Sequence, residues 1–123
     1  MAALLLVDDE EDVLEALADA LARIGHRVAR ASSGLAALAI VDRKEPLDLL
    51  LTDVVMPGLH GFNLARMVLL RRPDIRILYM SGYAEVDMVT KDTGPRYGKL
   101  LDKSLLPDQL KLEIEQALAP RRS

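Results

Sequence analysis

The chain has 123 residues, of which 50% are hydrophobic and only 3% aromatic, and this suits one domain with an aliphatic core. Its formal net charge of −3 argues against a nucleic-acid-binding protein, because phosphate backbones require a basic surface. The lack of cysteine excludes disulfides, thiolate metal sites and cysteine nucleophiles, and no apolar run approaches the roughly 18–20 residues that span a bilayer.

Hydrophobic patterning predicts strands that alternate with helices. The strands are short apolar or alternating runs, and the helices carry apolar residues at three- and four-residue spacing. In chain order we expect a strand at residues 3–7, a helix at 11–24, a strand at 27–31, a helix at 33–44, a strand at 47–52, a helix at 62–72, a strand at 75–80, a helix at 84–93, a strand at 98–102 and a helix at 107–119. Gly25 ends the first helix, and Ser33 caps the second.

This alternation points to right-handed crossovers and to a parallel sheet in an α/β fold. In such sheets, ligands bind beyond the carboxyl ends of the strands. The side chains expected at these ends are charged or carry a hydroxyl group; they are Asp8, Asp9, Glu10, Asp53, Ser81 and Lys103. The pattern therefore gathers reactive groups from distant segments at one edge of the sheet.

The carboxylates of this set indicate a site for a divalent cation. Two unit charges about 4 Å apart repel by roughly 4 kcal/mol at an effective dielectric of about 20. Mg²⁺ would relieve this repulsion, since it prefers oxygen ligands and often shares its site with a phosphate. Asp53 can then act as the nucleophile of a phosphoryl transfer, while Lys103 and Ser81 contact the phosphoryl oxygens.

Each of these residues taken alone has a simpler explanation. Acidic residues after a strand commonly complement a helix dipole. Asp53 and Ser81 can be turn residues, and Lys103 can be a solvated lysine. Their joint occurrence at four of the five expected strand ends favours the functional interpretation.

The sequence resembles the receiver domain of bacterial two-component response regulators over essentially its whole length. The matching segments are Leu6–Glu10, Leu51–Gly58, Gly61, Met80–Gly82 and Lys103. The resemblance implies a flavodoxin-like (βα)5 three-layer sandwich, with a parallel five-stranded sheet in the order 2-1-3-4-5. We expect this domain to cover residues 1–119, followed by a disordered tail at 120–123.

The resemblance also implies a role for each residue of the site. Asp53 would be the phosphoacceptor, and Ser81 and Lys103 would contact the phosphoryl group. Mg²⁺, or Mn²⁺ in its place, would be held by Asp8, Asp9, Asp53 and the backbone carbonyl of Val55. Among these ligands, Asp9 is expected to bind the metal directly and Asp8 to act through water.

By the same resemblance, the protein is a signalling domain and not an enzyme beyond self-catalysed phosphorylation and dephosphorylation. The expected partners are a sensor histidine kinase or a histidine phosphotransfer protein, and a downstream protein target, with no nucleic acid and no membrane. We expect a cytoplasmic monomer or weak homodimer with output through protein contacts. The segment Met80–Glu85 resembles receivers attached to hybrid histidine kinases.

Two positions depart from the family pattern. Ser104 stands where the family has a proline joined to the lysine by a cis bond. A non-proline cis bond costs about 2.5–4 kcal/mol, so we expect a trans or strained bond and a displaced Lys103. Leu100 stands where the family has the aromatic residue that swings inward on phosphorylation. The weakly apolar segment at 84–93 is predicted to be the mobile part of the domain.

Two alternative functions stay open at this point. A degenerate receiver that acts only as an interaction module would fit the changes at positions 100 and 104. The other alternative is a Mg²⁺-dependent phosphohydrolase with an aspartate nucleophile. Val55 argues against this class, because such enzymes carry a second aspartate two residues after the nucleophile.

Overall fold

The computed structural model describes residues 2–82 and 97–120. The strands in this part of the chain are β1 (Ala3–Val7), β2 (Arg27–Ala31), β3 (Leu49–Asp53), β4 (Arg76–Ser81) and β5 (Gly98–Asp102). The helices are α1 (Glu11–Arg23), α2 (Gly34–Val41), α3 (Gly61–Arg71) and α5 (Pro107–Leu118). The helix expected at 84–93 and most of the expected tail lie outside the described residues.

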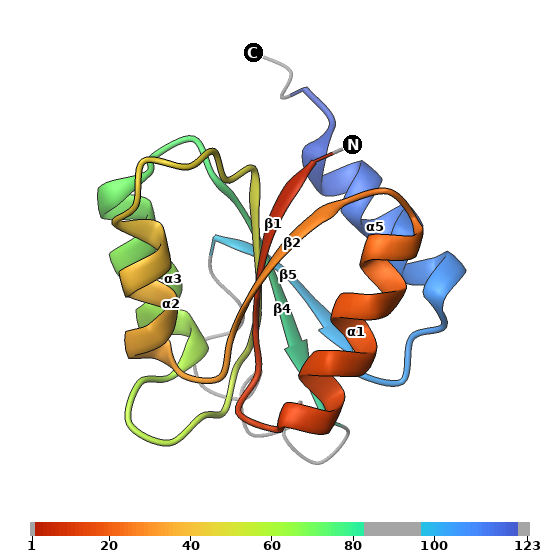
Figure 1. Ribbon diagram of the computed structural model, residues 1–123, viewed down its shortest axis with the longest axis horizontal. Coiled ribbons are helices and arrows are strands. Elements are labelled where there is room, and N and C mark those ends of the chain that lie inside the picture. Colours follow the sequence, from red (N-terminus) through yellow and green to blue (C-terminus); the bar gives the residue numbers. More distant parts are fainter. Residues whose placement is uncertain (1, 83–96, 121–123) are drawn as a thin grey trace.

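The strands form one parallel sheet in the order β2-β1-β3-β4-β5. Figure 1 shows α1 and α5 on one face of this sheet and α2 and α3 on the other. In the described residues, the connections from β1 to β2, from β2 to β3 and from β3 to β4 each run through a helix, as the alternating pattern predicts. The flavodoxin-like order predicted from the sequence is confirmed.

The central strands are buried on both faces of the sheet. Every residue of β3 is buried, and Leu4 to Val7 of β1 have no exposed surface. Successive side chains point to opposite faces, so Leu5 and Leu50 pack under α2 and α3, whereas Leu6 and Leu51 pack under α1 and α5. This double burial explains why both strands appear in the sequence as continuous apolar runs.

Arg72, directly after α3, accounts for the position at which α2 ends. Its guanidinium donates to the backbone carbonyls of Val41 at 3.0 Å and Glu45 at 2.7 Å, and also to that of Arg43. The carbonyls at a helix C-terminus have no helical N–H partner, and here a side chain that directly follows another helix supplies the donors. The helix expected at 33–44 was therefore too long, and it ends at Val41.

Gly61 allows α3 to begin very close to the end of β3. A Cβ atom at this position would lie 2.2 Å from the carbonyl oxygen of Asp53 and 3.0 Å from the Cα atom of Val54. The Gly61 amide donates to the carbonyl oxygen of Val54 at 2.8 Å. The loop after Asp53 thus leaves the sheet and returns to it within hydrogen-bonding distance.

Replacing Arg72 by methionine is expected to lower the free energy of unfolding by about 2 kcal/mol, because a charged donor to the end of α2 is lost. Arg71→Met is the matched control. Arg71 forms an ion pair with Asp42 at 2.8 Å in which both side chains are exposed, and such pairs contribute about 0–1 kcal/mol. Chemical denaturation followed by circular dichroism measures both variants. Equal losses would contradict a special role for Arg72.

Gly61→Ala is expected to lower the free energy of unfolding by about 1–3 kcal/mol, because the added methyl group collides with backbone atoms that cannot move aside. Asn63→Ala, at an exposed position of the same helix, should change it by no more than about 0.5 kcal/mol. Thermal melts of the two variants test this. A Gly61→Ala protein as stable as Asn63→Ala would mean that the loop can relax.

Candidate functional site

The carboxyl ends of the strands bring the predicted site residues to the lower edge of the sheet in Figure 1. Asp53 ends β3 and pairs in register with Met80, and Ser81 ends β4 and pairs with Asp102. Asp8 directly follows β1, and its amide donates to the carbonyl oxygen of β2's last residue at 3.2 Å. The parallel register therefore aligns residues that lie far apart in the sequence.

The acidic residues at this edge differ in burial. Asp8 has no exposed surface and Asp53 is 1% exposed, whereas Asp9 is exposed. Carboxylate oxygens from these three residues all lie within 4.8 Å of one another. The edge therefore combines two buried carboxylates with one that faces solvent.

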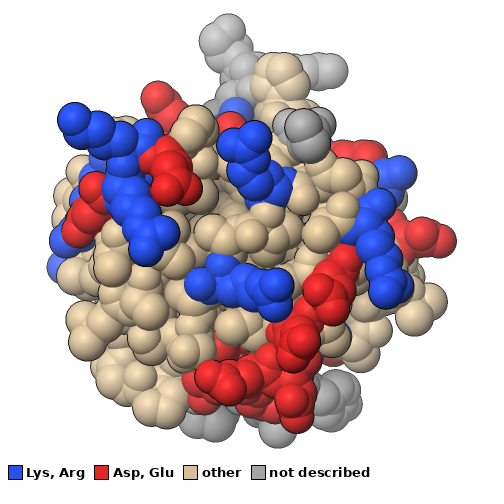
Figure 2. Space-filling model, viewed as in Figure 1, with Lys and Arg blue, Asp and Glu red and all other residues tan. Residues whose placement is uncertain are grey.

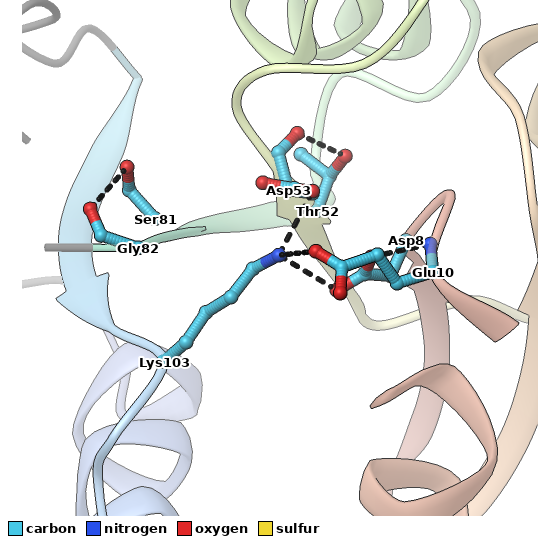
Figure 3. Close-up of polar contacts among 7 residues, drawn as sticks. All are labelled: Asp8, Glu10, Thr52, Asp53, Ser81, Gly82 and Lys103. Carbon is cyan, nitrogen blue, oxygen red and sulfur yellow. Dashed lines mark hydrogen bonds and ion pairs between the residues drawn. The ribbon is translucent and has the colours of Figure 1, made fainter. Parts of the chain in front are cut away.

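Lys103, which follows β5, links two of these carboxylates. Its Nζ atom lies 3.0 Å from Oδ2 of Asp53, 3.2 Å from Oδ2 of Asp8 and 3.6 Å from Oε1 of Glu10. Figure 3 shows the lysine side chain reaching from the end of β5 to this group of oxygens. One ammonium group thus joins side chains from the ends of β1, β3 and β5.

The same contacts affect the protonation of Lys103. Burial is the largest single influence and lowers the pKa of its ammonium group. The hydrogen bonds and charges of Asp53 and Asp8 outweigh burial, so that the pKa lies above the ordinary lysine value. Lys103 is therefore a permanent positive charge at neutral pH.

A local turn orients Asp8. Its Oδ1 atom accepts a hydrogen bond from the amide of Glu10 at 2.9 Å, an arrangement by which an aspartate closes a turn with the residue two positions later. Oδ1 is used in this way while Oδ2 faces Lys103 at 3.2 Å. The turn therefore holds the carboxylate with one oxygen toward the site.

The surface beside the edge is acidic. Figure 2 shows negatively charged side chains gathered at the lower end of the molecule, where α1 begins. This end of α1 carries Glu11 and Asp12 in its first turn, and the exposed residues Asp9 and Glu10 precede it. Such a field raises the local concentration of cations.

Ser81 lies at the same edge but is oriented differently. It has no exposed surface, and its hydroxyl group donates to the carbonyl oxygen of Gly82 at 3.3 Å. In Figure 3 it stands on the β4 side of Asp53. The predicted contact of Ser81 with a phosphoryl group stays a prediction, as does that of the Val55 carbonyl with a metal.

The two departures from the family pattern have different outcomes. The trans bond expected between Lys103 and Ser104 is confirmed, since no cis peptide occurs in the described residues. The expected displacement of Lys103 stays a prediction, and its ammonium group reaches Asp53 at 3.0 Å. Leu100 is half-buried and packs against the core beneath α2 and α3.

Two contacts at the site were missed by sequence reasoning. Glu10 pairs with Lys103 at 3.6 Å, although its place in the acidic run after the first strand was visible. The hydroxyl group of Thr52 donates to the backbone carbonyl of Asp53 at 3.0 Å. A threonine within an apolar strand is the signal for this second contact, because a buried hydroxyl group requires a partner.

The donor set fits a hard divalent cation. Asp8, Asp9 and Asp53 offer only oxygen atoms, and the cluster carries more negative charge than Lys103 balances. Mg²⁺ and Mn²⁺ prefer such ligands. Receiver domains bind Mg²⁺ at an aspartate cluster of this kind, and this chain groups the corresponding residues.

Known proteins resemble this chain in sequence over nearly its full length. Residues 4–115 match the family model of the response regulator receiver domain. The chain is 36% identical over 118 residues to the response regulator receiver protein CpdR of Brucella abortus, covering 96% of this chain and 98% of CpdR. It is 30% identical over 112 residues to sporulation initiation phosphotransferase F of Bacillus subtilis, covering 88% of this chain and 90% of that protein.

Solved structures agree with these similarities. The response regulator TrrA of Thermotoga maritima, in complex with Mg²⁺-BeF, superimposes with a TM-score of 0.81 at 26% identity, covering 96% of this chain and 100% of TrrA. No helix in the described part of the chain has the length and apolar character needed to cross a membrane. The parallel sheet, the acidic edge with its lysine and these matches lead to one conclusion: the chain belongs to the response regulator receiver domain family and is a receiver domain of two-component phosphorelay signalling.

Proposed function

We propose that Asp53 accepts a phosphoryl group from the phosphohistidine of a sensor histidine kinase or a phosphotransfer protein. The observation that carries this proposal is the pairing of Asp53 with Lys103 at 3.0 Å, beside the carboxylate of Asp8. A nucleophilic carboxylate, a fixed cation and further oxygen ligands are the parts that phosphoryl transfer requires.

In the proposed reaction a carboxylate oxygen of Asp53 attacks the phosphorus atom as the bond to the donor's imidazole nitrogen breaks. The product is an acyl phosphate on Asp53, and the imidazole leaves with a proton from solvent. A carboxylate nucleophile has no proton to lose when it attacks, so the step needs no general base. The protein therefore contributes mainly position and charge.

The residues that would hold Mg²⁺, or Mn²⁺, are Asp8, Asp9, Asp53 and the backbone carbonyl of Val55. When bound, the metal supplies positive charge for one phosphoryl oxygen. The exposed carboxylate of Asp9 suits direct ligation, while the buried carboxylate of Asp8 is already oriented by its turn. This assignment is supported by the grouping of their oxygens within 4.8 Å.

Lys103 and Ser81 would bind the remaining phosphoryl oxygens. Lys103 is cationic and adjacent to Asp53, so its ammonium group can bind the carboxylate before the transfer and the phosphoryl oxygens after it. The Ser81 hydroxyl must turn away from the Gly82 carbonyl, which it reaches at 3.3 Å. A bond of this length between neutral groups is weak.

We further propose a cytoplasmic setting, with a kinase or phosphotransfer partner before this step and a protein target after it. The similarity to a sensor kinase, CckA of Brucella abortus, supports this class of partner. The two sequences are 40% identical over 85 residues, which cover 68% of this chain and 9% of that protein. The degenerate receiver and the phosphohydrolase are not favoured. Acid cluster, hydroxyl group and lysine are all present at the edge, and Val55 occupies the position of a hydrolase's second aspartate.

Phosphorylation of Asp53 is tested by incubating the protein with acetyl phosphate and Mg²⁺ and measuring its intact mass. The wild type is expected to gain one phosphoryl group, and Asp53→Asn is expected to gain none because the nucleophile is absent. Asp74→Asn, which changes an exposed aspartate, is the matched control and should label like the wild type. Labelling of Asp53→Asn would show that another residue accepts the phosphoryl group. Beryllofluoride binding is the second readout. A wild type that gains no mass and binds no beryllofluoride would refute the proposal.

Lys103→Met is expected to bind Mg²⁺ about tenfold more tightly and to be phosphorylated more slowly. The ammonium group competes with the metal for Asp8 and Asp53, and removing it leaves about 1.4 kcal/mol or more of additional attraction for a cation. Lys99→Met is the control, since Lys99 pairs with Glu113 away from the site. Titration calorimetry with Mg²⁺ gives both affinities. An unchanged or weaker affinity in Lys103→Met would show that lysine and metal do not share these carboxylates.

A further inference from the structure

The lysine that contacts Asp53 lies in a four-residue turn directly after β5. The amide of Leu105 donates to the carbonyl oxygen of Asp102 at 3.1 Å, and this bond closes a turn in which Lys103 is the second residue. The amide of Ser104 donates to the Oδ1 atom of Asp102 at 2.9 Å. Asp102 therefore accepts two hydrogen bonds from the turn, one through its backbone and one through its side chain.

This turn controls where the Lys103 side chain starts. The lysine reaches from β5 across β4 to Asp53 on β3, and neighbouring strands lie about 4.8 Å apart. Its ammonium group is thus far from its own backbone, so a small rotation of the turn moves it by more than a hydrogen bond tolerates. The extended side chain is visible in Figure 3.

A backbone hydrogen bond outside the turn anchors Lys103 to the sheet. Its amide donates to the carbonyl oxygen of Ser81 at 3.0 Å. The hydrogen bond from the Ser104 amide to the Asp102 carboxylate adds a second restraint on the other side of Lys103. A proline at position 104 has no N–H group and cannot make this bond, so Asp102 and Ser104 act as a pair.

Asp102 is suited to this task because its carboxylate is exposed and ionised. The hydrogen bonds from the backbone and the side chain of Ser104 lower the pKa of Asp102, which keeps it a strong acceptor at neutral pH. Aspartate is also a favoured first residue of such turns, since its side chain bonds the amide two positions later. Among the described residues, the Asp102 carboxylate accepts its hydrogen bond from the turn and does not contact Asp53.

We propose that Asp102 is a positioning residue: its carboxylate, through the Ser104 amide, holds the turn that directs Lys103 at the phosphoryl group on Asp53. This inference rests on the proposed function of Asp53 and Lys103. It assigns Asp102 no contact with the reacting atoms. It also explains why Lys103 reaches the site although position 104 is not proline.

The test measures the rate of phosphorylation by acetyl phosphate at saturating Mg²⁺, together with the melting temperature. Asp102→Ala is expected to slow phosphorylation about tenfold, because the ammonium group is no longer held in place. Asp102→Asn keeps an oxygen acceptor and should restore the rate to within about twofold of the wild type. Asp108→Ala removes a nearby exposed charge outside the turn and should leave the rate unchanged.

A double substitution shows whether Asp102 acts through Ser104. In Ser104→Pro the amide donor is gone, so adding Asp102→Ala should change the rate no further, whatever the rate of Ser104→Pro itself. A purely structural role would lower the melting temperature of Asp102→Ala and Asp102→Asn without this pattern of rates.

Three results would overturn the inference: a wild-type rate in Asp102→Ala, an Asp102→Asn protein as slow as Asp102→Ala, or an equal effect of Asp102→Ala with and without Ser104→Pro. Failure of the proposed function looks different. In that case the wild type itself is not phosphorylated, or Asp53→Asn is phosphorylated as well.

Discussion

The pairing of one lysine with carboxylates from two other strand ends holds the functional edge of this protein together. Asp8 and Asp53 have almost no exposed surface, and an unpaired buried carboxylate costs several kcal/mol. Lys103 brings the opposite charge from the end of β5, 3.2 Å from Asp8 and 3.0 Å from Asp53. The tight approach at Gly61 and the turn around Lys103 both place members of this group, so they serve the same electrostatic requirement.

The requirement links stability to chemistry. One lysine does not balance two buried carboxylates and the exposed acids beside them, so the edge keeps a negative field that attracts a divalent cation. In the proposed function, phosphoryl transfer adds further negative charge at Asp53. The protein meets this demand with charges that are already in place, which avoids reorganisation during the reaction. A receiver domain can therefore be small, because the phosphoryl donor supplies the reactive bond and the fold supplies only the charged edge.

The sheet was predictable from local sequence, whereas some element boundaries were not. Apolar runs such as Leu4 to Val7 have one physical explanation, burial on both faces, and this gave β1 and β3 their places at the centre. The end of α2 depends instead on Arg72, which directly follows another helix, α3. No spacing rule within residues 33–44 contains that information. The helix expected at 84–93 lies outside the described residues, and its prediction stands as made.

The residues of the site followed from the ends of the strands, but their geometry depended on contacts that a motif does not encode. The missing proline at position 104 suggested a displaced Lys103, yet the Ser104 amide that replaces it is a hydrogen-bond donor, and Asp102 uses it. Leu100 is different, because leucine has no ring to swing and is packed against the core beside buried Tyr79, its partner in register. The Asp102–Ser104 hydrogen bond thus takes the place of the missing proline in directing Lys103 to Asp53. At position 100, by contrast, leucine cannot take the place of the missing aromatic ring. The proposed phosphoacceptance at Asp53 therefore depends on Lys103 and the turn that holds it, and not on the residue at position 100.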